Sequence, residues 1–234
     1  MPNWVENEVT FKSSREKLDI IENKVRRTIN TMENGEQVIQ DLTGQLFPMP
    51  KELENLVGTD DNITRFKDLN GNVVKIPQME AITYFQMNED DLLGHGYIME
   101  TLSQDELKEL DDKYGAHDWY NWNIKNYGTK WGDCETSLKI SDKEKLVYTF
   151  ESAWSPAFQF VEHVAREFKL DVEYKYFSLE NGDKGSINFN QKGVVIKQTW
   201  EMLDESYFKF IDDVENSEGD SVSGKELEDS ENPF

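Results

Sequence analysis

The chain has 234 residues, a net charge of −22 and a hydrophobic fraction of 37%, with one cysteine. No apolar run approaches the roughly 18 residues that cross a bilayer, and the first residues lack the basic and apolar regions of a signal peptide, so we expect a cytoplasmic protein without membrane contact. The single cysteine excludes an intramolecular disulfide framework and a Cys-rich zinc site. The negative charge disfavours direct binding to duplex DNA.

The N-terminal region predicts one strand and one helix. Residues 5–11 alternate between apolar and polar side chains, which predicts a strand. Ser13 and Glu16 have the spacing of a capping box, and apolar residues at helical spacing follow them. We therefore expect a helix that ends near Asn34-Gly35, where glycine favours the stop.

The next segment, residues 36–134, is less regular. Asn70-Gly71 lies between two strand-like stretches and predicts a hairpin over residues 65–76, because these two residues accept the positive φ of a type I′ turn. Residues 102–114 predict a helix that begins with a second capping box, formed by Ser103 and Glu106.

Regular patterning returns after residue 134. Alternation of apolar residues predicts strands over residues 135–140, 145–152, 172–176 and 187–189, and the β-branched run Val194-Val195-Ile196 suggests another. Ser155 as cap and Pro156 at the first helical position predict a helix between the second and third of these strands. Apolar residues at helical spacing from Trp200 to Ile211 predict a last helix.

The order of these elements indicates the fold. Without residues 36–134 it is strand, helix, strand, strand, helix, strand, the order of an α+β, ferredoxin-like (split βαβ) antiparallel sheet. We expect a core of residues 1–35 and 135–215, with an extra strand and helix at its C-terminal end. Residues 36–134 would form a large insertion packed on the core. Residues 216–234 are acidic and poor in apolar side chains, and are expected to be disordered.

Four short motifs resemble those of a known family. They are Met1-Pro2-Asn3-Trp4 with Asn7, Phe47-Pro48-Met49-Pro50, Asn126-Tyr127-Gly128-Thr129-Lys130-Trp131 and Ala153-Trp154-Ser155-Pro156. With them the chain resembles the YubB-type family of phage- and plasmid-encoded proteins with a ferredoxin-like domain. The family pattern often has cysteine after the first tryptophan, where this chain has Val5. The resemblance implies the fold and a mobile-element origin, but no activity.

Residues 117–134 hold three of the six tryptophans and are the first candidate site. Aromatic faces could stack on a nucleobase while amides, including those of Asn121 and Asn123, read its edges. The candidate ligand-binding residues are Trp119, Trp122, Asn126, Tyr127, Thr129, Lys130, Trp131 and Trp154. The alternative, which we prefer from the sequence, is that the tryptophans fill the seam between insertion and sheet.

The second candidate site is acidic. Residues 86–118 contain ten acids and two lysines, and residues 212–234 contain nine acids and one lysine. The candidate partner-binding carboxylates are Glu89, Asp90, Asp91, Asp105, Glu109 and Asp112, the last three along one side of the predicted helix. They would present negative charge to a basic host protein, as DNA presents phosphates. The alternative is a solvated charged surface.

Metal binding and nucleophilic catalysis are not expected. The spacing of the possible ligands matches no known zinc or calcium pattern; these residues are His95, His117, Asp118, Asp133, Cys134 and Glu135. Cys134 or Ser155 with His163 would be the nucleophilic pairs, but nothing orients a general base, and His163 is expected on a polar, solvated helix face.

The sequence therefore predicts no catalytic residue, no metal and no cofactor. We expect a non-enzymatic accessory protein that binds a basic host protein, such as a defence or nucleic-acid-binding factor, through an acidic surface. The alternative is a nucleotide or nucleic-acid ligand bound by residues 117–134. The sequence does not indicate the oligomeric state.

Overall fold

The structure is a computed structural model that describes residues 2–31, 35–58, 62–76, 83–84 and 86–203. Most of the predicted last helix and the predicted tail of residues 216–234 lie outside the described residues. The helices are α1 (Arg15–Val25), α2 (Leu42–Leu46), α3 (Lys51–Glu54), α5 (Glu89–Gly94), α6 (Gln104–Tyr114), α7 (Trp119–Asn126) and α8 (Phe158–Phe168). None of these described helices is long and apolar enough to cross a bilayer.

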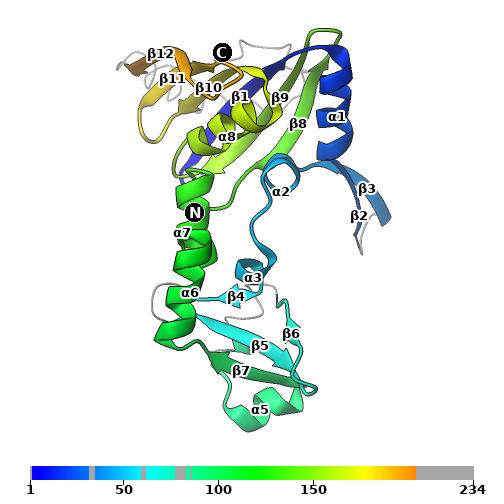
Figure 1. The fold of residues 1–234 in the computed structure, drawn as a ribbon, viewed down its shortest axis with the longest axis vertical. Coiled ribbons are helices and arrows are strands. Elements are labelled where there is room, and N and C mark those ends of the chain that lie inside the picture. Colours follow the sequence, from blue (N-terminus) through cyan, green and yellow to red (C-terminus); the bar gives the residue numbers. More distant parts are fainter. Residues whose placement is uncertain (1, 32–34, 59–61, 77–82, 85, 204–234) are drawn as a thin grey trace, which may run out of the picture.

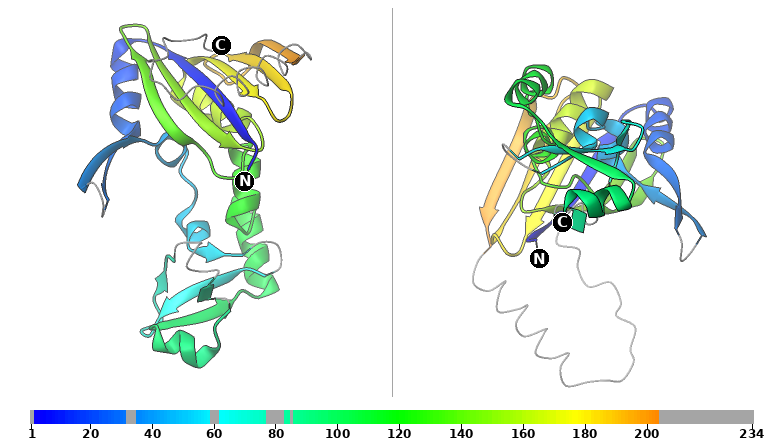
Figure 2. Two further views of the ribbon diagram at one scale, coloured as in Figure 1. Left: turned by 180° about the vertical axis from the view of Figure 1, so that it is seen from behind. Right: turned by 90° about the horizontal axis from the view of Figure 1, so that it is seen from below.

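The strands form two main groups and a hairpin. They are β1 (Trp4–Lys12), β2 (Arg26–Thr31), β3 (Gly35–Gln40), β4 (Leu56–Val57), β5 (Thr64–Asp68), β6 (Val73–Val74), β7 (Tyr97–Thr101), β8 (Cys134–Ser141), β9 (Lys145–Ala153), β10 (Asp171–Ser178), β11 (Asp183–Phe189) and β12 (Val195–Met202). In Figure 1 the larger sheet and the smaller sheet lie at opposite ends of the molecule, and α6 and α7 run between them. The view from behind in Figure 2 shows the same separation.

The main sheet has the strand order β12-β11-β10-β1-β9-β8, and every neighbouring pair is antiparallel. Its four strands β10-β1-β9-β8, with α1 after β1 and α8 after β9, have the split βαβ topology. The predicted α+β, ferredoxin-like fold is therefore confirmed. β11 and β12 extend this sheet beyond β10.

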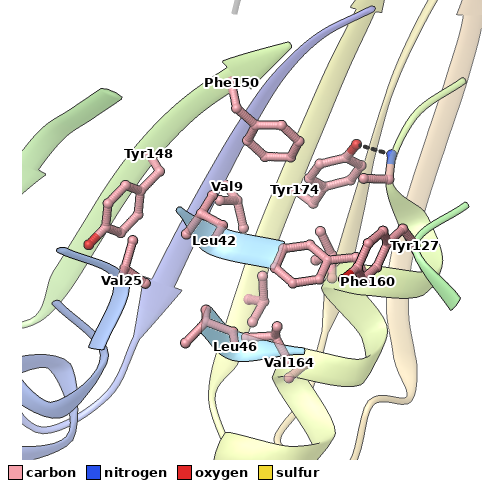
Figure 3. Close-up of a cluster of buried hydrophobic side chains, with 14 of the residues drawn as sticks. Val9, Val25, Leu42, Leu46, Tyr127, Tyr148, Phe150, Phe160, Val164 and Tyr174 are labelled. Carbon is pink, nitrogen blue, oxygen red and sulfur yellow. Dashed lines mark hydrogen bonds between the residues drawn. The ribbon is translucent and has the colours of Figure 1, made fainter. Parts of the chain in front are cut away.

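The main core lies between this sheet and its helices. Alternation along β1 buries Val5, Val9 and Phe11 completely. In Figure 3, Val9 lies near Phe150 of β9, with Phe160 and Val164 of α8 in the same cluster of buried side chains. Removing these apolar side chains from water is the main favourable contribution to the stability of this half.

The smaller sheet is built around β5, which pairs with β4, β6 and β7. The predicted hairpin is confirmed as β5 and β6, with Gly71 in the turn at a φ of 85°. The predicted capping box of Ser103 and Glu106 is also present at the start of α6. We call the described residues between 51 and 114, which include α3, α5, α6 and this sheet, the distal lobe.

The predicted N-terminal helix is too long. α1 ends at Val25, and the following residues form β2, which pairs with β3 in a separate hairpin. Thr28, Ile29 and Thr31 are β-branched, and this stiffness favours a strand over a helix. The first capping box is also wrong, because Ser14 is the N-cap and its side chain makes no capping hydrogen bond.

Two further boundaries differ from the predictions. α8 begins at Phe158, after Ala157, and the Ser155 hydroxyl donates to the carbonyl oxygen of Gly128 at 2.5 Å instead of capping a helix. Trp200 lies in β12, which pairs with β11, so no helix begins there. The β-branched residues between 195 and 199 explain this strand.

Candidate functional site

The aromatic block of residues 117–134 begins with a helix, α7. The Asp118 side chain caps it, accepting from the backbone nitrogen of Asn121 at 2.7 Å and from the Asn121 amide at 2.6 Å. Asp118 is completely buried. This carboxylate is thus committed to the helix end, where the positive end of the helix dipole favours it.

Two of the predicted ligand-binding aromatics lie in the main core. Trp122 and Tyr127 are each 4% exposed, and their ring centroids lie 5.3 and 5.9 Å from that of Phe47. The Tyr127 hydroxyl donates to the carbonyl oxygen of Phe47 at 2.8 Å, and burial raises the pKa of this phenol. These two rings fill the seam between α7, α8 and the segment before α3, where a ligand would have to displace core packing.

Polar contacts also hold the segment after α7 against β9. The buried Thr129 hydroxyl donates to the carbonyl oxygen of Ala153 at 2.7 Å. Gly128 has a φ of 83°, and a Cβ there would lie 2.0 Å from Oε1 of Gln159. Glycine is therefore needed both for the backbone conformation and for the close approach of the chain. Asn126 donates to the carbonyl oxygen of Trp122 at 2.9 Å, within α7.

A buried polar network lies beside these contacts. The Asn7 amide donates to the carbonyl oxygen of Val5 at 2.7 Å and to Oγ of Ser152 at 3.0 Å, and it accepts from the Tyr174 hydroxyl. Tyr174 in turn accepts from the backbone nitrogen of Ala157 at 2.8 Å, the dashed line in Figure 3. The four sequence motifs thus meet at one place, which we call the junction: Asn7, Phe47, Trp122, Tyr127, Gly128, Thr129, Ser152 and Ser155.

The remaining tryptophans of the prediction are more exposed. Trp131 is 42% exposed and Trp154 is 48% exposed, whereas Trp119 is half-buried. The Trp131 ring centroid lies 6.0 Å from that of Trp4, and Nζ of Lys130 lies 5.0 Å from the Trp131 ring. The eight candidate ligand-binding residues therefore do not form one pocket.

Two of the eight candidate residues, Trp119 and Trp131, do line a hollow beside α7. It has a volume of about 240 Å³, and its lining combines two tryptophans with residues from far along the chain: Met49, Glu54, Leu56, Lys75, Ile76, Trp119, Asn123 and Trp131. Asn123 is 5% exposed and donates to the carbonyl oxygen of Lys130 at 2.8 Å. Its Oδ1 accepts no hydrogen bond from the described residues. No local sequence signal predicts the wall formed by residues 49–76.

The six candidate carboxylates all lie exposed on the distal lobe. Three are in the first turn of α5 and three follow one side of α6. Within the described chain none of the six forms an ion pair; they are Glu89, Asp90, Asp91, Asp105, Glu109 and Asp112. Their negative charge is therefore directed toward solvent.

Other acids of the lobe are paired. Arg65 binds Glu100 and also Glu106, the latter at 2.6 Å, and Nζ of Lys67 lies 2.7 Å from Glu100. Hydrogen bonds from Ser103, together with Arg65, lower the pKa of Glu106 to about 2. The paired acids hold α6 and β7 against β5. The six candidate carboxylates make no such link between elements.

The residues considered for metal binding or nucleophilic catalysis have other contacts. Asp133 accepts from the backbone nitrogens of Leu42 and Thr43, at 2.9 and 2.7 Å, at the start of α2. Burial and neighbouring carboxylates raise the pKa of the Cys134 thiol to about 11. His163 is half-buried, not solvated as predicted, and its ring stacks on Phe47 with centroids 3.5 Å apart.

Comparison with known proteins gives one family match. Residues 126–219 match the family model described as a ferredoxin-like domain in Api92-like protein. These residues include β8, β9, α8 and β10 to β12, so the match agrees with the topology of the main sheet. No curated protein matches the chain. Among solved structures, the crystal structure of a protein api92 from Yersinia pseudotuberculosis is similar, with 11% identity, a TM-score of 0.45, and coverage of 87% of this chain and 99% of that chain.

Proposed function

We propose that this is a non-enzymatic binding protein whose distal lobe contacts a basic host protein through its unpaired carboxylates. The observation that carries the proposal is the set of six exposed carboxylates on α5 and α6 that have no cationic partner among the described residues. The resemblance of the four short motifs to the YubB-type family implies a phage or plasmid origin. For a protein of that origin, an acidic surface that mimics DNA suits a host defence or nucleic-acid-binding factor as the partner.

The electrostatics favour a protein partner over nucleic acid. Unpaired carboxylates on one lobe give a negative field that attracts lysine and arginine side chains and repels phosphate. Along one side of α6, Asp105, Glu109 and Asp112 recur at intervals of four and three residues, so they can meet a row of cations together. Such complementarity raises the association rate and selects basic partners.

The test is the affinity of the full-length protein for a labelled peptide of alternating lysine and serine, measured by fluorescence anisotropy at low and high salt. We expect binding at low salt that weakens as salt screens the charges. Neutralising one side of α6 with Asp105→Asn, Glu109→Gln and Asp112→Asn should weaken it about tenfold, since each lost surface pair contributes about 0.2–1 kcal/mol.

The matched control neutralises three exposed glutamates on the main-sheet half, with Glu16→Gln, Glu167→Gln and Glu180→Gln. Both triple variants change the net charge equally, so a difference between them reports the position of the charges and not their number. Equal affinities of the two variants, or no binding at low salt, would refute the proposal.

A second candidate function rests on the hollow beside α7. Trp119 and Trp131 line the hollow with aromatic surface that suits a planar ring, and Asn123 in the same lining has an Oδ1 that accepts no hydrogen bond from the described residues. A thermal-shift screen of nucleotides tests it. We expect a shift that Trp131→Ala abolishes, whereas Trp154→Ala, which removes a similarly exposed tryptophan outside the hollow, leaves it unchanged. No shift with any nucleotide would reject this function.

A further inference from the structure

An apolar groove lies between α5 and β7 in the distal lobe. Its volume is about 280 Å³. The described residues that line it are one acid and six largely apolar residues: Met87, Glu89, Leu92, Leu93, Tyr97, Ile98 and Met99. Leu93 is 47% exposed, Ile98 is 41% exposed and Met99 is 37% exposed. A cluster of exposed apolar side chains marks a binding site more often than a single exposed apolar residue does.

The local fold explains why these side chains remain exposed. Leu92 is buried in a small cluster with Val57, Phe66 and Ile76. This contact fixes the face of α5 that points to the core, so the adjacent Leu93 must point elsewhere. α5 has six residues, less than two turns, and the chain turns at Gly96 into β7 two residues after it, so the helix lies beside the strand (Figure 1).

β7 contributes the other wall. It pairs with β5 along one edge, with Met99 opposite Phe66 and Ile98 opposite Lys67. No other described strand pairs with β7, so its second edge is not covered by a strand of the described chain. The groove therefore combines exposed apolar side chains with a strand edge.

The charge around the groove selects its occupant. Glu89 lines it, and Asp90 and Asp91 lie in the same exposed turn of α5. Asp91 accepts from the Asn88 amide at 2.7 Å, and none of the three carboxylates is paired with a described lysine or arginine. An acidic segment would be repelled here, whereas a basic segment would be attracted. Methionine and leucine side chains adapt to apolar groups of different shape.

We infer that the groove binds a segment of the partner protein in which lysine or arginine residues alternate with large apolar side chains. The apolar side chains enter the groove, and the cations meet the carboxylates of α5. This inference rests on the proposed function and deepens it, because the lobe then recognises an amphipathic basic segment and not positive charge alone.

Three labelled peptides of equal length test the inference on the full-length protein: lysine with leucine, lysine with serine, and glutamate with leucine. We expect the lysine–leucine peptide to bind about tenfold more tightly than the lysine–serine peptide, since burying even one leucine contributes that much. The glutamate–leucine peptide should not bind.

Two variants locate the site. Leu93→Gln with Met99→Thr removes apolar surface from the two walls of the groove, because Met99 lies on the face of β7 that Phe66 and Leu92 share, and it keeps residues suited to helix and strand. We expect it to abolish the advantage of leucine over serine. Leu69→Gln with Val73→Thr removes two comparably exposed apolar residues of the same lobe outside the groove, and should leave the advantage unchanged.

The outcomes separate the two proposals. Equal, salt-sensitive binding of both lysine peptides would overturn the groove while supporting the acidic lobe. An advantage of leucine that survives in the Leu93/Met99 variant would also overturn the groove. Binding of the glutamate–leucine peptide would overturn the basic character of the partner. Binding of neither lysine peptide at low salt would refute the proposed function itself.

Discussion

The junction and the distal lobe are stabilised in different ways. At the junction, the neutral side chains of Asn7 and Ser152 form hydrogen bonds with each other and with the neighbouring Tyr174, away from water. In the lobe, half-exposed ion pairs link Arg65 to Glu106 and Lys113 to Glu52. Buried neutral hydrogen bonds depend little on salt or pH, whereas surface ion pairs depend on both.

The difference teaches where binding can occur. At the junction most polar groups form hydrogen bonds with one another, so few donors or acceptors are free to bind a partner. In the lobe, the paired acids hold the fold together, and the six candidate carboxylates of α5 and α6 form no ion pair with a described residue. The four short sequence motifs therefore contribute to the architecture, and the unpaired acidic residues remain available for recognition.

The largest expected effect is at the aromatic centre of the junction. Trp122→Ala should lower the free energy of unfolding by about 3–5 kcal/mol, because it leaves a cavity in close-packed core. Trp154→Ala, at an exposed position, should cost less than about 1 kcal/mol. Urea denaturation measures both. A loss below 1 kcal/mol for the Trp122 variant would show that the junction is not the structural centre of the fold.

The buried polar network should give the next largest effect. Asn7→Ala leaves Tyr174 and Ser152 without their partner, and should cost about 3 kcal/mol, since each buried unsatisfied group costs about 1–3 kcal/mol. Asn23→Ala, on the exposed face of α1, is the control and should change stability by less than about 0.5 kcal/mol. Equal effects of the two would contradict the role given to Asn7.

A smaller, pH-dependent effect is expected in the lobe. The pKa of Glu106 is about 2 in the folded protein and near 4.5 when unfolded, so its contribution is complete above pH 4.5 and is lost as pH falls toward 2. Because the side chain is 37% exposed, we expect Glu106→Gln to cost at most about 1 kcal/mol at pH 7.

The same comparison at lower pH distinguishes the two regions. The cost of Glu106→Gln should shrink between pH 5 and pH 3, whereas the cost of Asn7→Ala should stay constant, because no member of its network titrates in that range. Urea denaturation at each pH measures both costs. A constant cost for the Glu106 variant would contradict its assigned hydrogen bonds.

The smallest effect on stability should come from the unpaired acids. Neutralising Asp105, Glu109 and Asp112 together should change the free energy of unfolding by about 0.5 kcal/mol or less, since they make no ion pair with described residues. A loss above 2 kcal/mol would show that these carboxylates hold the fold, and would remove the distinction between paired and unpaired acids.

Local sequence patterns predicted the elements that depend on local interactions. Alternation located the strands of the main sheet, and capping chemistry located α6 at Ser103 and Glu106. The β2–β3 hairpin was missed, and β12 was predicted only at its start, over residues 194–196, while residues from Trp200 on were assigned to a helix. Apolar spacing in short segments fits helix and strand equally, and pairing with a neighbouring strand decides between them.

The candidate sites also differ in how far the sequence could predict them. The exposure of the six carboxylates follows from their helical spacing and charge. The hollow beside α7 joins Met49 and Ile76 to Trp131, and the groove joins α5 to β7, contacts that depend on tertiary packing and leave no mark at fixed sequence spacing. Burial of Trp122 but not of Trp131 depends on the same packing.

The most direct test of the central claim is the salt dependence of binding to the lysine–serine peptide. Affinity is measured across a salt series for the native protein, the Asp105/Glu109/Asp112 triple variant and the Glu16/Glu167/Glu180 triple variant. We predict that the slope of log Kd against log salt falls for the α6 variant and stays native-like for the control, because the removed ion contacts lie on the distal lobe. An equal fall in slope for both variants would show that net charge alone, and not the distal lobe, governs binding.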